Sequence, residues 1–149
     1  MGASTRKTWG LGALGAGVAL SLAVAGIAWA QDMMPAPKGA SVKITSPADG
    51  AKVRSPFKVK MSVSGIAIEP AGPPKAGTGH HHLIIDGGPE KEGTAVPADG
   101  SHLHFGKGQT EAELNLNPGK HTITAQFADG VHRSYGAALS HTITVTVEY

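Results

Sequence analysis

The stretch TEAELNLNPGKHTITAQFA (Thr110–Ala128) decides the fold class, because its apolar residues recur at every second position. These residues are Ala112, Leu114 and Leu116 before the turn and Ile123, Ala125 and Phe127 after it. A period of two is typical of a strand with one buried face. Asn117–Gly119 joins the two halves, since proline and glycine interrupt regular structure. The stretch therefore predicts two consecutive strands connected by a turn.

The rest of the chain after Ala40 continues this pattern. Further strands are expected in SVKIT (41–45), FKVKMSVSG (57–65), HHHLIID (80–86) and SHTITVTVEY (140–149). No segment in this part repeats its apolar residues at the helical period of 3.6. About seven strands in about 110 residues, separated by glycine- and proline-containing turns, predict a single antiparallel β-sandwich of immunoglobulin-like type. A small closed β-barrel is the alternative.

The N-terminal thirty residues have the pattern of a secretory signal peptide. Arg6 and Lys7 precede an uncharged apolar run, Trp9–Ala30, which ends in the small-x-small sequence Ala-Trp-Ala. An uncleaved membrane anchor is the competing interpretation, because the run is just long enough to span a bilayer. We expect cleavage after residue 30, a flexible proline-rich lead-in over 31–40, and the β-sandwich domain over 41–149. The mature protein would then be periplasmic or secreted, with no membrane span.

Charge and cysteine content exclude several kinds of partner and site. Without Arg6 and Lys7, 11 basic and 11 acidic residues remain, so the mature chain is neutral overall when histidine is uncharged. No basic stripe with interleaved aromatic residues remains, which argues against a nucleic-acid partner. The chain has no cysteine, which excludes disulfides and thiolate metal sites.

Histidine is the residue type that indicates a functional site. Of eight histidines, His80, His81 and His82 are consecutive, and His102 and His104 repeat the His-x-His spacing. Residues i and i+2 of a strand lie on one face, about 6–7 Å apart. The pairs His80/His82 and His102/His104 could therefore supply four imidazole nitrogens to one ion, a set that suits copper or zinc. Such affinity should fall as the pH drops through about 6.5 and the rings protonate.

The remaining histidines are assigned by their position in the predicted strands. If Leu83 and Ile85 face the core, His81 faces it too, and His81 is only a secondary candidate ligand. His121 and His141 each begin a strand on its apolar side. We expect these two to cap one end of the sandwich and to hydrogen-bond to backbone. In the alternative, His141 is a further candidate ligand, and that end forms the floor of the site together with His132.

Three segments of the sequence resemble a known protein family. GHHHLIID, HLHFGKGQTEAELNLNPGKHTITAQFADGVHRSYG and SHTITVTV are similar to the small exported bacterial domains grouped as domain of unknown function 4399. The resemblance extends over roughly Ser41 to Val147. It implies an exported, compact β domain with a histidine-rich signature and no assigned activity. No catalytic residue is carried over by it.

These observations favour a periplasmic protein that binds a metal ion, copper before zinc, for capture, buffering or delivery without catalytic turnover. His80, His82, His102 and His104 would be the primary ligands. A second interpretation is a docking module for another periplasmic or envelope protein, with structural or pH-sensing histidines. Its contact surface would be the loops at 69–79 and 87–109. A third is a small metalloenzyme with histidine ligands and an open coordination position.

Overall fold

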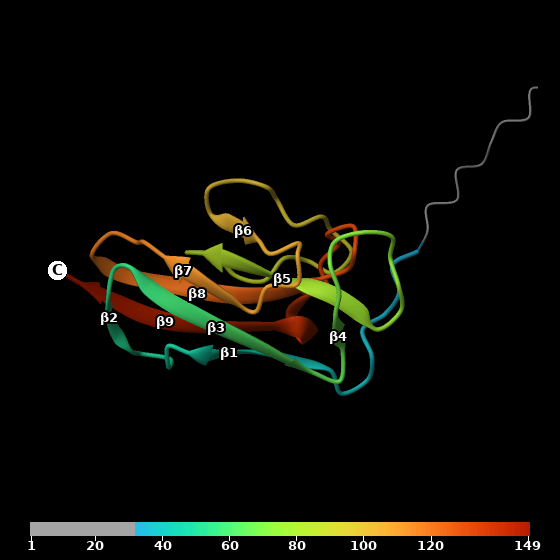
Figure 1. Cartoon of the computed structure of the whole chain (residues 1–149), viewed down its shortest axis with the longest axis horizontal. Helices are drawn as coiled ribbons and strands as arrows, with labels where there is room; N and C mark the ends of the chain where they lie inside the picture. Colours follow the sequence, from blue (N-terminus) through green and yellow to red (C-terminus); the bar gives the residue numbers. More distant parts are fainter. Residues whose placement is uncertain (1–31) are drawn as a thin grey trace, which may run out of the picture. The chain divides into compact units, whose positions relative to one another are not determined.

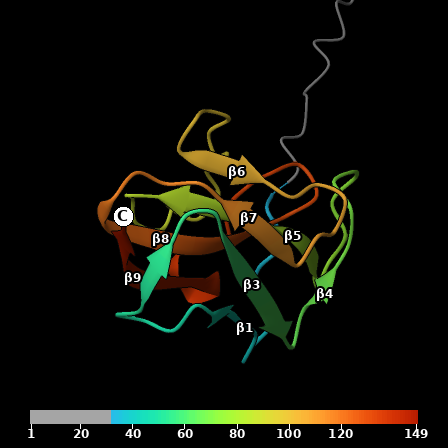
Figure 2. The ribbon, with the colours of Figure 1, turned by 60° about the vertical axis from the view of Figure 1, so that its left-hand side comes forward.

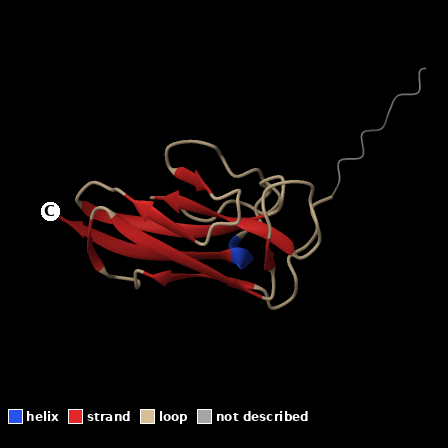
Figure 3. Ribbon diagram, viewed as in Figure 1, coloured by secondary structure: helices blue, strands red, loops and turns tan. Residues whose placement is uncertain are grey.

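The computed structural model describes residues 32–149, and Asp32–Tyr149 form one compact unit (Figure 1). The expected signal peptide lies outside the described residues. The described part contains strands β1 (Ser41–Ser46), β2 (Lys52–Arg54), β3 (Phe57–Ser64), β4 (Ala67–Ile68), β5 (Thr78–Ile85), β6 (His102–His104), β7 (Glu111–Leu114), β8 (Gly119–Ala128) and β9 (Ser140–Glu148). A single 3-10 turn, η1 (Ala137–Leu139), precedes β9 (Figure 3). Within residues 32–149, no helix is long and apolar enough to cross a membrane.

Two sheets make up the fold (Figures 1 and 2). The first contains three strands in the order β1-β3-β7, and the second follows the order β2-β9-β8-β5-β4. The prediction of an all-β sandwich is confirmed. Most pairings are antiparallel, but the short strands β2 and β4 pair in parallel with β9 and β5. Both additions are edge strands of two or three residues, too short to show a sequence period.

The outer edge of β5 is divided between two partners, and this division places the histidines. Thr78 and Gly79 pair with β4, whereas residues 82–84 pair with β6. The other edge of β5 pairs with β8 from residue 80 to residue 85. Figure 1 shows β6 on the side of β5 that is away from β1. The strand that carries three consecutive histidines is therefore an interior strand of its sheet.

The core lies between the sheets and is formed by the alternating apolar residues of both. Its fully buried members include Val59, Leu83, Ile123, Ala125, Phe127 and Val145. Met33 and Ala36, in the segment before β1, are partly buried against this core. The alternation seen in the sequence thus corresponds to one core-facing side of each strand.

The outer face of the larger sheet is also covered. The Thr124 hydroxyl donates to the Gly87 carbonyl, and the Glu90 N–H donates to the Gln126 side-chain oxygen. Loop residues 86–101 therefore lie over β8, and both faces of β8 are buried from Ile123 to Ala128. This cover creates a second buried region, between the sheet and its loops, in addition to the core between the sheets.

Candidate metal centre

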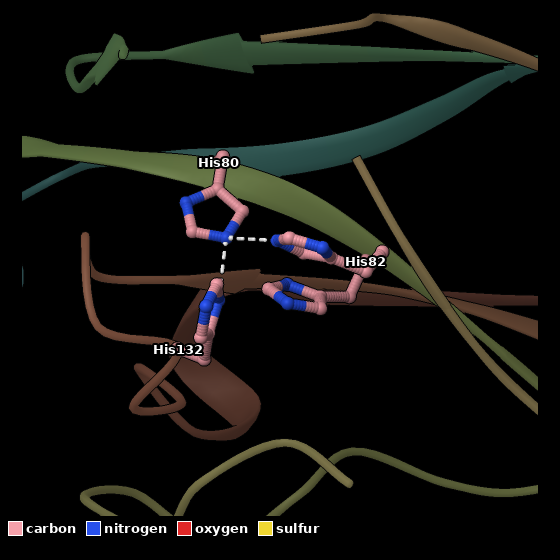
Figure 4. A group of neighbouring side chains, drawn as sticks. His80, His82 and His132 are labelled. Carbon is pink, nitrogen blue, oxygen red and sulfur yellow. Dashed lines mark hydrogen bonds between the residues drawn. The ribbon is translucent and has the colours of Figure 1, made fainter. Parts of the chain in front are cut away.

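Four histidines come together on the loop-covered side of the larger sheet. They are His80 and His82 on β5, His104 on β6, and His132 in the turn after β8. One ring nitrogen of each lies within 4.8 Å of the others. Figure 4 shows His80, His82 and His132 with their rings directed toward one another. His80 and His82 are buried, His132 is partly buried and His104 is exposed, so the group reaches from the interior to solvent.

Strand parity and register place the first three members. His80 and His82 share one face of β5 because they are two residues apart. His104 is the direct cross-strand partner of His82, and the centroids of these two rings are 5.0 Å apart. Directly opposed residues on antiparallel strands have Cβ atoms about 4.5–5.5 Å apart, which is close enough for rings to meet.

The fourth member, His132, is positioned by a tight turn. Asp129 is buried, and its carboxylate accepts hydrogen bonds from the N–H groups of Val131 and Arg133, at 3.0 and 2.9 Å. The same carboxylate accepts a 2.7 Å bond from the Arg133 guanidinium. His132 has a φ of +69°, a left-handed conformation in which histidine is found more often than most residues other than glycine. The carbonyl of His132 accepts the N–H of Val96, which ties the turn to the covering loop.

The nitrogen atoms of the group are incompletely paired. His80 Nε2 lies 3.0 Å from His132 Nδ1 and 3.1 Å from His104 Nε2. The Nδ1 atoms of His80 and His82 are buried without a hydrogen-bond partner. Four nitrogens arranged tetrahedrally around an ion at 2.0–2.1 Å are about 3.3 Å apart. Small rotations of the rings would reach that spacing, so the donor set fits a histidine-ligated ion.

The family described as Domain of unknown function (DUF4399) matches residues 59–148, a range that includes all four histidines. The chain belongs to this family. Comparison with curated proteins and with solved structures gave no match. Membership of the DUF4399 family thus agrees with the resemblance drawn from the sequence, and the chemistry of the site follows from its own residues.

Burial keeps the two innermost rings of this DUF4399 domain neutral. Loss of solvation, followed by repulsion from His132 and His104, lowers the pKa of His80 to about 4. Loss of solvation and repulsion from the neighbouring rings lower the pKa of His82 to about 3. Burial and His132 also lower the pKa of His104. At neutral pH these three imidazoles are unprotonated, which is the form that binds metal ions.

His102, expected from the sequence to join the group, lies outside it. The register pairs His104 with His82 and His102 with Ile84, so His102 lies one repeat further along β5, away from His80. Its Nδ1 is 2.7 Å from Asp99 and its Nε2 is 3.3 Å from Glu90. Burial lowers the pKa of His102, but the hydrogen bonds and charges of Asp99 and Glu90 together raise it. His102 is therefore part of a surface ion-pair cluster.

The secondary candidates His81 and His141 also lie outside the group. His81 points into the core against Phe127, with ring centroids 5.1 Å apart, so of the two orientations that the sequence left open for β5, the one with Leu83 facing the core is found. Both of its ring nitrogens are buried and unpartnered. His141 Nδ1 accepts the backbone N–H of Ile44 at 3.1 Å. His121 contacts the Asp86 carboxylate and the Asn117 carbonyl, each at 2.9 Å. His121 and His141 thus make backbone hydrogen bonds as expected, but they do not cap one end of the sandwich together, because the register pairs His121 with Val145 and His141 with Ala125.

His132 was considered in the sequence only as part of a floor beside His121 and His141. It does not lie with His121, which is near the start of β8, because His132 follows the end of that strand. A signal was present: Asp129-Gly130 predicts a turn directly after the strand, and the next histidine lies two residues on. The position of His132 beside His80 could not be inferred without knowing that β8 pairs with β5 along residues 80–85.

Proposed function

We propose that this domain binds one metal ion through His80, His82, His104 and His132, and that its role is capture, buffering or delivery of that ion. The convergence of four imidazoles on one point is the observation that carries the proposal. Burial of His80 and His82 without full hydrogen bonding would be costly in a purely structural arrangement, since unpartnered buried nitrogens lose their solvation. A cation bound between the rings would be held by His80 Nε2, which faces His132 Nδ1 and His104 Nε2.

Copper is the proposed ion, with zinc as its competitor. All four donors are imidazoles, and imidazole suits both metals. Copper(II) binds nitrogen donors more tightly than zinc does in the Irving–Williams order, which favours copper where both are present. We further propose that the domain works outside the cytoplasm, because residues 1–30 have the pattern of a signal peptide. Delivery would then involve another periplasmic or envelope protein.

The first test is the metal content and stoichiometry of tag-free protein. We expect one tightly held ion per chain, and loss of that ion when His80, His82, His104 and His132 are all changed to Ala. The exposed ring of His104 allows a milder variant, His104→Ala, which we expect to weaken binding at least tenfold without unfolding the domain. Equilibrium dialysis followed by elemental analysis measures both quantities.

The matched control is His102→Ala, which removes a neighbouring histidine of the same strand that is outside the group. It should retain full stoichiometry and affinity. Several weakly held ions per chain, or equal losses in His102→Ala and His104→Ala, would show adventitious binding and contradict the proposal. The docking-module interpretation would then take its place.

The metal affinity of the domain should decrease less on acidification than the affinity of four free imidazoles. Four ligands with the ordinary pKa of about 6.5 would lose about six orders of magnitude in affinity between pH 7 and pH 5. The pKa values of about 4 for His80 and about 3 for His82 remove proton competition at these two ligands over that range. We expect the total loss to be smaller than six orders by about three, because two of the four ligands no longer compete with protons over this range.

Competition with a chelator of known protonation constants measures this pH dependence. A decrease of about six orders would show that the buried rings titrate normally. An affinity with no pH dependence down to pH 3 would argue against imidazole ligation altogether.

A further inference from the structure

A small pocket lies against the histidine group and is not accounted for by ion binding alone. Its volume is about 100 Å³, and its walls are His82, His104, His132 and the segment Val96, Pro97 and Ala98. His80 is not among these walls. The pocket therefore borders three members of the group but not His80, its most deeply buried member.

The non-histidine wall of the pocket is hydrocarbon. Val96 is buried, whereas Pro97 and Ala98 are exposed, and none of the three carries a polar side chain. The N–H of Val96 is already donated to the His132 carbonyl at 2.9 Å. This hydrogen bond holds the pocket wall and one proposed ligand in a fixed relation. A molecule in the pocket would be recognised by its size and by the ion it contacts.

On the basis of the proposed metal site, we propose that the bound ion keeps one coordination position directed into this pocket. This position takes a small inorganic molecule. Copper(II) with nitrogen donors favours tetragonal geometry, and zinc can expand from four to five ligands, so four histidines leave room for a fifth donor. An apolar cavity of 150 Å³ holds benzene. The pocket here, at about 100 Å³, therefore takes up to about four heavy atoms.

Azide is the probe, because it is a linear molecule of three heavy atoms that binds copper(II) directly. Copper(II)-loaded protein is titrated with sodium azide, while the electron paramagnetic resonance and visible spectra are recorded. A saturable change with one azide per copper, and copper still bound after the azide is removed, is the expected result. Unchanged spectra, or removal of the copper by azide, would overturn the proposed open coordination position. Neither result would contradict the proposal that the four histidines bind a metal ion.

Substitutions that fill the pocket test whether azide reaches the ion through the pocket or directly from solvent. Ala98→Phe should weaken azide binding at least tenfold and change copper affinity less than threefold, since Ala98 lines the pocket without being a ligand. Ala95→Phe is the matched control, an equally large substitution on the same loop outside the pocket wall, and it should change neither. Val96→Leu, which adds one methylene, is a second filling variant if Ala98→Phe is poorly folded. Equal azide affinity in the filled variants and the wild type would overturn the inference. A chain that binds no copper at all would overturn the proposed function along with it.

Discussion

Acidifying the metal-free protein from pH 7 to pH 4 is expected to lower its free energy of unfolding by about 6–9 kcal/mol, at about 2–3 kcal/mol for each of three buried histidines. The three are His80, His81 and His82, whose residues expose no more than 2% of their surface. Burial is the largest cause of the lowered pKa in each, which falls to about 4 for His80 and His81 and to about 3 for His82. A domain of this size is stabilised by about 5–15 kcal/mol in total, so protonation of these three rings would remove much or all of its stability.

The direction of the effect follows from the protonation of the two states. Below pH 6.5 the unfolded chain binds protons on these histidines, whereas the folded chain does not bind them until about pH 4. The contribution of these three rings is therefore constant above pH 6.5, is lost between pH 6.5 and about 4, and levels off below the folded pKa values. His102 and His121 oppose this trend, since their pKa values are raised in the folded state and their contribution is present below pH 6.5.

His81→Leu tests the assignment without touching the proposed ligands. His81 lies against Phe127 with both ring nitrogens unpartnered, so an apolar side chain of similar size removes an unsatisfied buried group. We expect a gain of about 1–3 kcal/mol at pH 7 and an acid loss smaller by about a third. Urea unfolding followed by circular dichroism at several pH values, with a chelator present, measures both. A stability that stays flat from pH 7 to pH 4 would contradict the prediction.

Gly79→Ala is expected to cost about 3 kcal/mol or more, at the top of the range for overpacked interiors. A Cβ at this position would meet the Ala128 carbonyl oxygen directly and would lie 2.7 Å from the Phe127 ring. The carbonyl belongs to the backbone of β8, which cannot turn away as a flexible side chain could. Strands β5 and β8 would have to separate at the end where His80 pairs with Ala128.

Gly88→Ala is the control for that substitution. Nothing lies within 4 Å of a Cβ at Gly88, and its φ is not in the left-handed region, so a change within about 0.5 kcal/mol is expected. Thermal unfolding of the two variants provides the comparison. Any Gly79→Ala protein that folds should also bind metal less tightly than Gly88→Ala, since His80 follows Gly79 directly. Equal stability of the two variants would show that β5 and β8 are less closely packed than described.

The strands, and which residues share one side of a strand, are local properties that the sequence determined by itself. Alternation with a period of two placed Leu83 and His81 on one side of β5 and His80 on the other, whereas the apolar run 83–85 left open which side faces the core. Such parity depends only on neighbours two residues apart along one strand. The same reasoning recovered the β-sandwich, because each core-facing stripe must be buried against another sheet.

The composition of the histidine group was decided only by the tertiary structure. Whether His102 or His104 meets His82 depends on the register between two strands separated by a long loop, and a local period carries no information about that register. His132 enters the group through a turn built by the buried Asp129 carboxylate and through the pairing of β8 with β5. The covering of the outer face by residues 86–101 then buries His80 and His82, and burial is what lowers their pKa values. Contacts between residues far apart in the sequence thus turned a histidine-rich strand into a site of defined geometry and charge.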